Sequence, residues 1–204
     1  MTDFDSRAAT WDADPRKVER ARRTAEAIAR RVPALAGRRV LEYGCGTGLL
    51  GFALRPQVAA VTMADSSPGM LEELGRKIAA SGLSGLTPLR LDLATDPPPA
   101  ERFDLICSLM TLHHVPDTAA LLRAFRDLLT PAGVVCLADL DAEDGTFHPP
   151  GVEVHHGFDR GALAEKLDAA GFRDARFETV FEIAKETPGG ARSYPVFLVT
   201  AAVR

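Results

Sequence analysis

The chain has 204 residues, of which 46% are hydrophobic and 25% are charged, a balance typical of a globular protein. This length predicts one domain with a sizeable buried core. The net charge of −4 argues against a general nucleic-acid binder, which needs a basic surface. No apolar run approaches the ~18 residues of a membrane span, and the acidic N-terminus lacks the apolar stretch of a secretory signal. We therefore expect a cytoplasmic protein.

The first predicted helix runs from Pro15 to Arg31. Asp14 offers a side-chain cap, proline suits the first helical position, and Pro33 ends the helix. An apolar stripe continues along one face through Val18, Ala21, Ala25, Ile28 and Val32. Ahead of this helix, Phe4 and Trp11 stand among polar residues.

A strand, a glycine turn and a helix follow. Val40 and Leu41 read as the end of a buried strand, and the turn runs into the apolar Leu49 and Leu50. Glycine alternates through the turn at Gly44, Gly46 and Gly48. Glycines allow positive φ and remove the β-carbons that would hold a ligand away from the main chain. A nucleotide-like group can therefore lie against this turn.

Strands and helices then alternate as far as Leu140, which predicts right-handed crossovers and a parallel sheet. The expected strands are Val58–Asp65, Leu86–Leu93, Phe103–Leu109 and Val134–Leu140. One helix is expected from Ser67-Pro68 to near Gly82, and another from Asp117 or Thr118 onward. Pro131-Ala132-Gly133 is predicted to turn the chain into the strand that ends at Leu140.

The pattern of residues 141–204 predicts a loop, a helix and a hairpin. Residues 141–156 show little periodicity, and a loop of that length usually has a functional use. Asp159 is expected to cap a helix that ends at Gly171. Phe172–Ala184 and Val196–Ala202 read as strands around a loop, Lys185–Pro195, and such a pair forms an antiparallel hairpin.

The run Gly44-x-Gly46-x-Gly48, with Glu42 two residues ahead, resembles the first motif of class I S-adenosylmethionine (SAM)-dependent methyltransferases. The element order is similar over nearly the whole chain. The resemblance implies an α/β, Rossmann-like sheet of seven strands, mostly parallel with a C-terminal antiparallel hairpin and helices on both faces. It implies one domain over residues 1–204, with a helical lid (1–35), a cofactor-binding core (36–140) and a substrate-side region (141–204).

Asp65 ends the second strand, where an acid accepts hydrogen bonds from ribose hydroxyls in both NAD and SAM sites. The resemblance implies that Asp92 meets the adenine amino group, which favours SAM, with S-adenosylhomocysteine as product. It also implies that Glu42 orients the turn, that Ser66 and Met70 flank ribose and adenine, and that Ser108 and Leu109 face the methionine end. The expected cofactor-binding residues are Glu42, Gly44, Gly46, Gly48, Asp65, Ser66, Met70, Asp92, Leu93, Ser108 and Leu109.

The segment Leu109–Asp117 contains Leu-His-His-Val-Pro-Asp, which resembles the small-molecule branch that includes ubiquinone- and menaquinone-biosynthesis methyltransferases. The Asn/Asp-Pro-Pro-Tyr motif of DNA methyltransferases is missing there. The resemblance thus implies a small-molecule methyl acceptor. Imidazole suits a base near neutral pH, so His113 and His114 are the candidate catalytic residues. His155 and His156 could approach the same mouth.

A metal is not expected. A cluster of acids and histidines, Asp139, Asp141, Glu143, Asp144, His148, His155 and His156, resembles a ligand set. Magnesium-dependent methyltransferases, however, need an acid at the end of strand four, where Ser108 and Leu109 stand. Two other functions compete with the methyltransferase: a nicotinamide oxidoreductase, and a SAM-binding protein that acts as a partner without turnover. The sequence leaves the acceptor, the methylated atom and the oligomeric state open.

Overall fold

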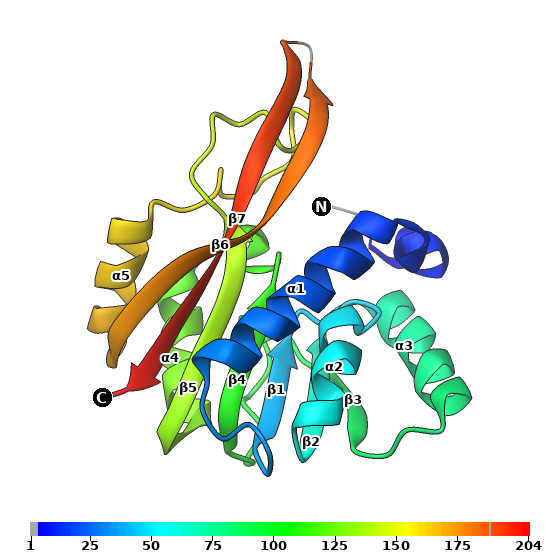
Figure 1. Ribbon diagram of the computed structural model, residues 1–204, viewed down its shortest axis with the longest axis vertical. Coiled ribbons are helices and arrows are strands. Elements are labelled where there is room, and N and C mark those ends of the chain that lie inside the picture. Colours follow the sequence, from blue (N-terminus) through cyan, green and yellow to red (C-terminus); the bar gives the residue numbers. More distant parts are fainter. Residues whose placement is uncertain (1–3, 188) are drawn as a thin grey trace.

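The computed structural model describes residues 4–187 and 189–204 (Figure 1). Its centre is a seven-stranded sheet in the order β3-β2-β1-β4-β5-β7-β6. The strands are β1 (Arg39–Tyr43), β2 (Ala60–Asp65), β3 (Leu86–Arg90), β4 (Phe103–Leu109), β5 (Leu129–Leu140), β6 (Phe172–Thr187) and β7 (Gly190–Val203). The first five pair in parallel, whereas β7 runs antiparallel to β5 and β6. The predicted fold class is confirmed.

Helices cover both faces of this sheet, as predicted (Figure 1). The helices α1 (Pro15–Arg31), α2 (Leu49–Leu54) and α3 (Pro68–Ser81) share one core, and α4 (Thr118–Leu128) and α5 (Arg160–Ala169) share the other. Three 3₁₀ turns are η1 (Asp5–Ala13), η2 (Arg55–Gln57) and η3 (Leu112–His114). Among the residues that the structure describes, no helix combines the length and the apolar character that crossing a membrane requires.

Strand residues alternate between the two cores. Val40 and Leu105 pack with α1 and α2, whereas their neighbours Leu41 and Ile106 pack with α4 and α5. All four are at most 1% exposed. Parallel strands that are buried on both faces need apolar residues at successive positions, which explains why these strands lack polar alternation.

Local signals placed the helix starts correctly. The four expected caps each accept a hydrogen bond from a backbone N–H of the first helical turn, and these caps are Asp14, Ser67, Asp117 and Asp159. Gly82 ends α3 in the left-handed conformation, at φ 64°. Helix ends depend on hydrogen bonds between residues that are close in the sequence, so they can be predicted from the sequence directly.

The boundaries of β2 and β3 differ from the prediction. β2 starts at Ala60, because η2 occupies Arg55–Gln57. β3 ends at Arg90 rather than Leu93, because Asp92 and Asp96 form a tight turn: the carboxylate of Asp96 accepts from Asp92 N at 2.8 Å. Asp92 therefore lies just beyond the strand.

The hairpin is longer than predicted. The ladder of β6 with β7 continues to the pair Thr187 and Gly190, so most of the expected loop Lys185–Pro195 is strand, and residue 188 lies outside the described residues. This extension projects beyond the rest of the sheet (Figure 1). Most of its side chains are polar, so its sequence lacks the alternation of apolar residues that indicates a strand.

β5 likewise starts earlier than predicted, at Leu129. The predicted turn Pro131-Ala132-Gly133 lies inside this strand, where the pairing with β4 is irregular.

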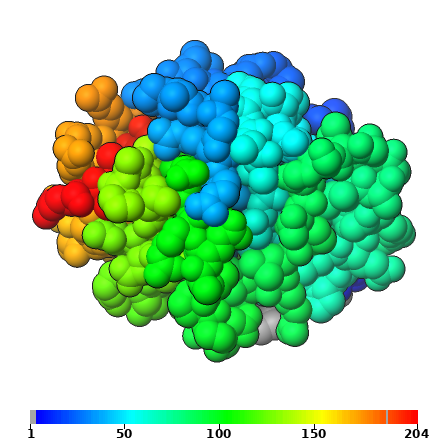
Figure 2. Space-filling view, turned by 90° about the horizontal axis from the view of Figure 1, so that it is seen from below, coloured from blue at the N-terminus to red at the C-terminus, as the bar shows by residue number. Residues whose placement is uncertain are grey.

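The parallel strands begin at the end of the molecule that Figure 2 shows. Loops that lead into these strands, and the C-terminus in red at the left, form this surface. The opposite edge collects the carboxyl ends of the parallel strands. Ligands of open α/β sheets bind at that edge.

Glu42 of β1 joins the sheet to α2. Its side chain is 2% exposed, and one carboxyl oxygen accepts the backbone N–H of Gly51 at 2.9 Å. Burial raises the pKa of Glu42 to about 8, because the loss of water disfavours the carboxylate more than the bond to Gly51 stabilises it.

This raised pKa predicts a pH-dependent stability. The folded protein holds a proton that the unfolded chain releases above its ordinary pKa of 4.5, so the stabilisation is complete below about pH 4.5 and is lost as pH rises through about 8. Glu42→Gln removes the proton but keeps an oxygen for Gly51. We expect the unfolding free energy of wild type to fall with rising pH in this range. The slope for E42Q should be shallower than that of wild type by up to about 1 kcal/mol per pH unit. Urea unfolding measures the slope, and E72Q, exposed on α3, is the control; equal slopes for E42Q and wild type contradict the assignment.

Candidate active site

The predicted site residues lie at the carboxyl edge of the sheet, in the last residues of β1, β2 and β4 or just beyond the ends of β1, β2, β3 and β4. The glycine turn follows Tyr43 of β1. Asp65 ends β2 and Leu109 ends β4. The parallel register brings these strand ends together, although they are far apart in the sequence.

The glycine turn requires its glycines. Gly44, Gly46 and Gly48 have φ values of 70°, 53° and 86°, which favour a residue without a β-carbon. A β-carbon on Gly44 would lie 2.2 Å from Thr111 Cγ2, and Thr111 Oγ1 donates to Gly44 O at 3.2 Å. The turn is therefore packed closely against the segment that follows β4.

Asp65 ties this turn to the start of α3. Its Oδ2 accepts from Gly46 N at 2.7 Å, and its Oδ1 accepts from Ser67 N at 2.9 Å. Burial raises the pKa of Asp65, although these backbone bonds oppose the shift. Each carboxylate oxygen has a second lone pair, so both oxygens can accept one more hydrogen bond.

Ser66 and Met70, which the sequence predicts beside the ribose and adenine, follow Asp65 in the chain. Ser66 is exposed, whereas Met70, in the first turn of α3, is 1% exposed. Met70 Sδ lies 3.8 Å from the point that a β-carbon on Gly46 would occupy. Met70 thus forms an apolar wall beside the glycine turn.

Asp92 and Leu93 lie at the same edge. Leu93 N donates to the hydroxyl of Tyr43 at 3.2 Å, and Asp92 Oδ1 accepts from Ala94 N at 3.0 Å. The pKa of Tyr43 is raised to about 12, first by burial and then by the negative charges of Asp92 and Asp65. Tyr43 thus joins the end of β1 to the turn that contains Asp92 and Leu93.

Ser108 and Leu109 have different surroundings. Ser108 is buried, and its hydroxyl donates to Tyr43 O at 2.8 Å, which joins β4 to β1. Leu109 is half-buried at the strand end. Next to it, Met110 has φ 58°, an unfavourable value for a residue with a side chain, and its N–H donates to Ala138 O at 2.8 Å. This sharp turn directs the chain from β4 toward β5.

The N-terminal segment η1 covers the glycine turn. Asp12 accepts from Thr47 Oγ1 and from Lys77 Nζ, each at 2.5 Å. Trp11 Nε1 lies 3.9 Å from the point that a β-carbon on Gly46 would occupy. Lys17 Nζ lies 3.4 Å from the centre of the Trp11 ring. The pattern of the sequence indicated Trp11 but not Asp12 or Lys77, because their pairing joins segments distant in the chain.

A second contact fixes the start of the same segment. Asp5 Oδ1 accepts from Gly69 N at 2.8 Å and from Ser67 Oγ at 2.5 Å, so it lies at the N-terminal turn of α3. A carboxylate is favourable at this position because the first N–H groups of a helix lack partners within it. Phe4, one residue earlier, packs edge-on against His114 with ring centres 5.3 Å apart.

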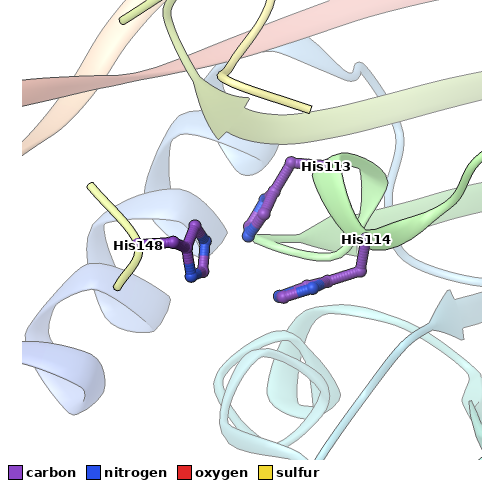
Figure 3. A group of neighbouring side chains, drawn as sticks. All are labelled: His113, His114 and His148. Atoms are coloured by element: carbon purple, nitrogen blue, oxygen red, sulfur yellow. The ribbon is translucent and has the colours of Figure 1, made fainter. Parts of the chain in front are cut away.

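Three histidines converge beside this segment (Figure 3). His113 and His114 come from η3, after β4, and His148 comes from the loop that faces them. The ring centre of His113 lies 4.1 Å from that of His114 and 5.1 Å from that of His148. His113 is 1% exposed, and its Nδ1 lies 2.6 Å from Asp139 Oδ1 at the end of β5. Asp139 is the partner that positions His113.

His155 and His156, the other expected candidates, are arranged differently. The ring of His155 bonds through Nε2 to Val115 O at 3.0 Å, and its backbone N–H donates to His113 O at 2.8 Å. His156 is exposed and lies beside Gly145. The histidine that this loop brings to His113 and His114 is therefore His148.

Two rings of this cluster, those of His114 and His148, are held neutral. The pKa values of His114 and His148 are both lowered to about 4, first by burial and then by the positive charge that His113 carries when protonated. Neutral imidazole offers one lone pair on a ring nitrogen. At neutral pH, His114 and His148 can therefore act as acceptors or ligands.

Known proteins are similar to this chain over much of its length. A family model described as "Methyltransferase domain" matches residues 16–177. The ubiquinone biosynthesis O-methyltransferase of Xylella fastidiosa (strain 9a5c) is 40% identical over 109 residues, 52% of this chain and 43% of that protein. The protein of the same name from Xanthomonas campestris pv. campestris (strain B100) is 35% identical over 142 residues, 67% of this chain and 58% of that protein. The chain thus spans about half the length of these curated relatives.

Solved structures share the whole fold. The structure described as a DhpI-SAH complex has a TM-score of 0.74 and 25% identity, and the match covers 98% of this chain and 92% of that chain. The family match spans most of the chain, and the sheet belongs to the predicted fold class. The chain belongs to the class I S-adenosylmethionine-dependent methyltransferase family.

Proposed function

We propose that this protein transfers a methyl group from SAM to a small-molecule acceptor. One observation carries the proposal: the glycine turn and Asp65 lie at the same sheet edge as His113 and His114, which follow β4. The names of the curated relatives, enzymes of ubiquinone biosynthesis, support a small acceptor. Family membership leaves no basis for the nicotinamide alternative.

The cofactor half would use the residues expected from the sequence. Gly44, Gly46 and Gly48 would let the methionine and ribose parts of SAM approach the main chain. The free lone pairs of Asp65 would accept the ribose hydroxyls, and Asp92, beside Leu93, would accept the adenine amino group. Ser66 and Met70 would flank the nucleoside. Glu42 and Ser108 would act by holding the turn and β4, because their side chains already bond to the backbone, and Leu109 would face the methionine end.

The acceptor half would supply position and, where needed, a base. The acceptor's lone pair attacks the methyl carbon as the carbon–sulfur bond breaks, and sulfur keeps that electron pair in S-adenosylhomocysteine. An acceptor that must lose a proton could give it to His113 or His114. Asp139 holds His113 through Nδ1, so Nε2 is the nitrogen available to the acceptor.

Residues 1–35 would serve as a lid over the cofactor, residues 36–140 as the cofactor-binding core, and residues 141–204 as the acceptor side; residues 1–3 lie outside the described residues. The contacts of Trp11 and Asp12 with the glycine turn support the lid. Because a transferable methyl must be kept from water, a cover at this edge has a direct use.

Asp65 provides the main test. Asp65→Ala removes the acceptor for the ribose hydroxyls, so we expect SAM and S-adenosylhomocysteine to bind about 10- to 100-fold more weakly in calorimetric titration. Asp65→Asn keeps the side chain's size and one oxygen acceptor for the backbone, and it should also bind weakly. Asp127→Ala, at an exposed position of α4, should bind like wild type.

Two outcomes contradict parts of this proposal. Unchanged SAM affinity in both Asp65 variants would refute the ribose assignment. Failure of the wild type to bind SAM or S-adenosylhomocysteine would remove the proposed activity and bring forward a partner role without turnover. Screening of quinol precursors and small phenols for methyl transfer then separates turnover from binding alone.

Trp11 reports on the lid. It is the single tryptophan of the chain, so its fluorescence should change as SAM binds beside Gly46. Asp12→Ala removes the partners of Thr47 and Lys77. Since the Lys77–Asp12 pair is partly exposed, its loss should weaken closure by about 1 kcal/mol and raise the SAM dissociation rate roughly fivefold. Stopped-flow fluorescence measures the rate; an unchanged rate argues against the lid.

A further inference from the structure

We propose that His113, His114 and His148 form a binding site for a first-row transition-metal ion of the Zn²⁺ type. One nitrogen from each ring lies within 4.8 Å of the others, and the three rings point into one shared space (Figure 3). Two elements far apart in the sequence supply them. All donors of this site are imidazoles. It therefore differs from the magnesium site considered from the sequence, which needs a carboxylate at the end of β4.

His113 has the arrangement of a metal-ligating histidine. The carboxylate of Asp139 lies at its Nδ1 and also accepts from its backbone N–H at 3.2 Å and from Leu140 N at 2.7 Å. Asp139 is fully buried, so these bonds fix both the carboxylate and the ring. A proton on Nδ1 leaves the lone pair on Nε2. A carboxylate that holds the far nitrogen in this way orients histidines in zinc sites.

His148 carries the second independent observation. Its Nε2 is buried from solvent and has no hydrogen-bond partner among the residues that the structure describes. A buried polar atom without a partner costs free energy, so such an atom needs an explanation. A metal ion between the three rings would satisfy it.

The loop that carries His148 is fixed at several points. Glu143 Oε2 accepts from Thr146 N at 2.8 Å and from Phe147 N at 3.0 Å. Lys185 Nζ donates to Phe147 O at 2.7 Å, and its charge lies 3.6 Å from the centre of the Phe147 ring. His148 is therefore held near its partners rather than brought there by chance rotation of an unconstrained loop.

The chemistry of the donors selects the class of ion. Three neutral imidazoles suit Zn²⁺, Co²⁺, Ni²⁺ or Cu²⁺, whereas Mg²⁺ and Ca²⁺ prefer oxygen. Zinc–nitrogen bonds of about 2.0 to 2.1 Å bring tetrahedral donors to roughly 3.4 Å from one another. Donor atoms that lie within 4.8 Å of one another would therefore approach by at most about 1.4 Å when an ion binds.

Three protein ligands leave a fourth position open, as in catalytic zinc sites. For methyl transfer this role rests on the proposed function. A hydroxyl or thiol of the acceptor would lose its proton to water and bond to the ion through oxygen or sulfur. The same atom then attacks the methyl carbon as the carbon–sulfur bond of SAM breaks. The ion would thus replace a histidine base by lowering the pKa of the acceptor.

The test uses the full-length protein freed of metal with a chelator. Titration with Co²⁺ should give a visible ligand-field spectrum that saturates at one ion per chain, and Zn²⁺ should displace it. Zn²⁺, but not Mg²⁺, should raise the melting temperature. His148→Ala should bind Co²⁺ at least about 100-fold more weakly. His156→Ala, which removes an exposed histidine of the same loop, should bind like wild type.

SAM titration of the same samples separates this inference from the proposed function and checks folding. Wild type that binds SAM but gives no saturable Co²⁺ spectrum overturns the metal site alone. Equal Co²⁺ affinity in H148A and wild type overturns it as well, because the ion then binds elsewhere. A metal-binding protein that fails to bind SAM leaves the metal site standing and removes the methyltransferase proposal.

Discussion

The Asp65 carboxylate is the contact on which the cofactor edge depends. One oxygen accepts the N–H of Gly46, in the turn after β1, and the other accepts the N–H of Ser67, at the cap of α3. Two successive strand–helix units are thereby joined through one side chain. The glycine turn needs this external support, because three positive φ values in five residues offer little regular hydrogen bonding of their own. Asp65 thus positions the turn before any ligand arrives, and a preformed site loses less conformational entropy on binding.

Around this contact, the carboxyl edge of the sheet has two chemically different ends. One end is built from backbone groups and acids, and η1 lies over it through Asp5, Trp11 and Asp12. The other end is built from imidazoles, and the buried carboxylate of Asp139 orients one of them, His113. The turn at Met110 connects the two ends, since it redirects the chain from β4 so that η3 passes over β5. The strained φ of Met110 is the conformational cost of that placement.

Features that depend on residues close together in the sequence could be predicted from it. The caps at Asp14, Ser67, Asp117 and Asp159, the glycine turn and the buried run of β4 each depend on neighbouring residues, and all match. Features that depend on distant partners could not. The hairpin extension pairs polar residues, and the end of β3 depends on the turn between Asp92 and Asp96. His148 meets His113 only through the path of a loop without periodicity, so spacing could not distinguish it from His155 or His156.

The long hairpin of β6 and β7 contacts the loop of His148 and lies apart from the glycine turn. Its tip holds the loop of His148, through Lys185 on Phe147 O, Tyr194 on Thr146 and Arg192 on Asp144. The antiparallel strands thus hold the loop that carries the third histidine, whereas Asp65 and the glycine turn lie at the ends of parallel strands. A change in hairpin length would therefore act on the loop of His148, while Asp65 and the glycine turn belong to other strands. Under the proposed function, the acceptor side could then be altered through one peripheral hairpin, apart from the strands proposed to bind the methyl donor.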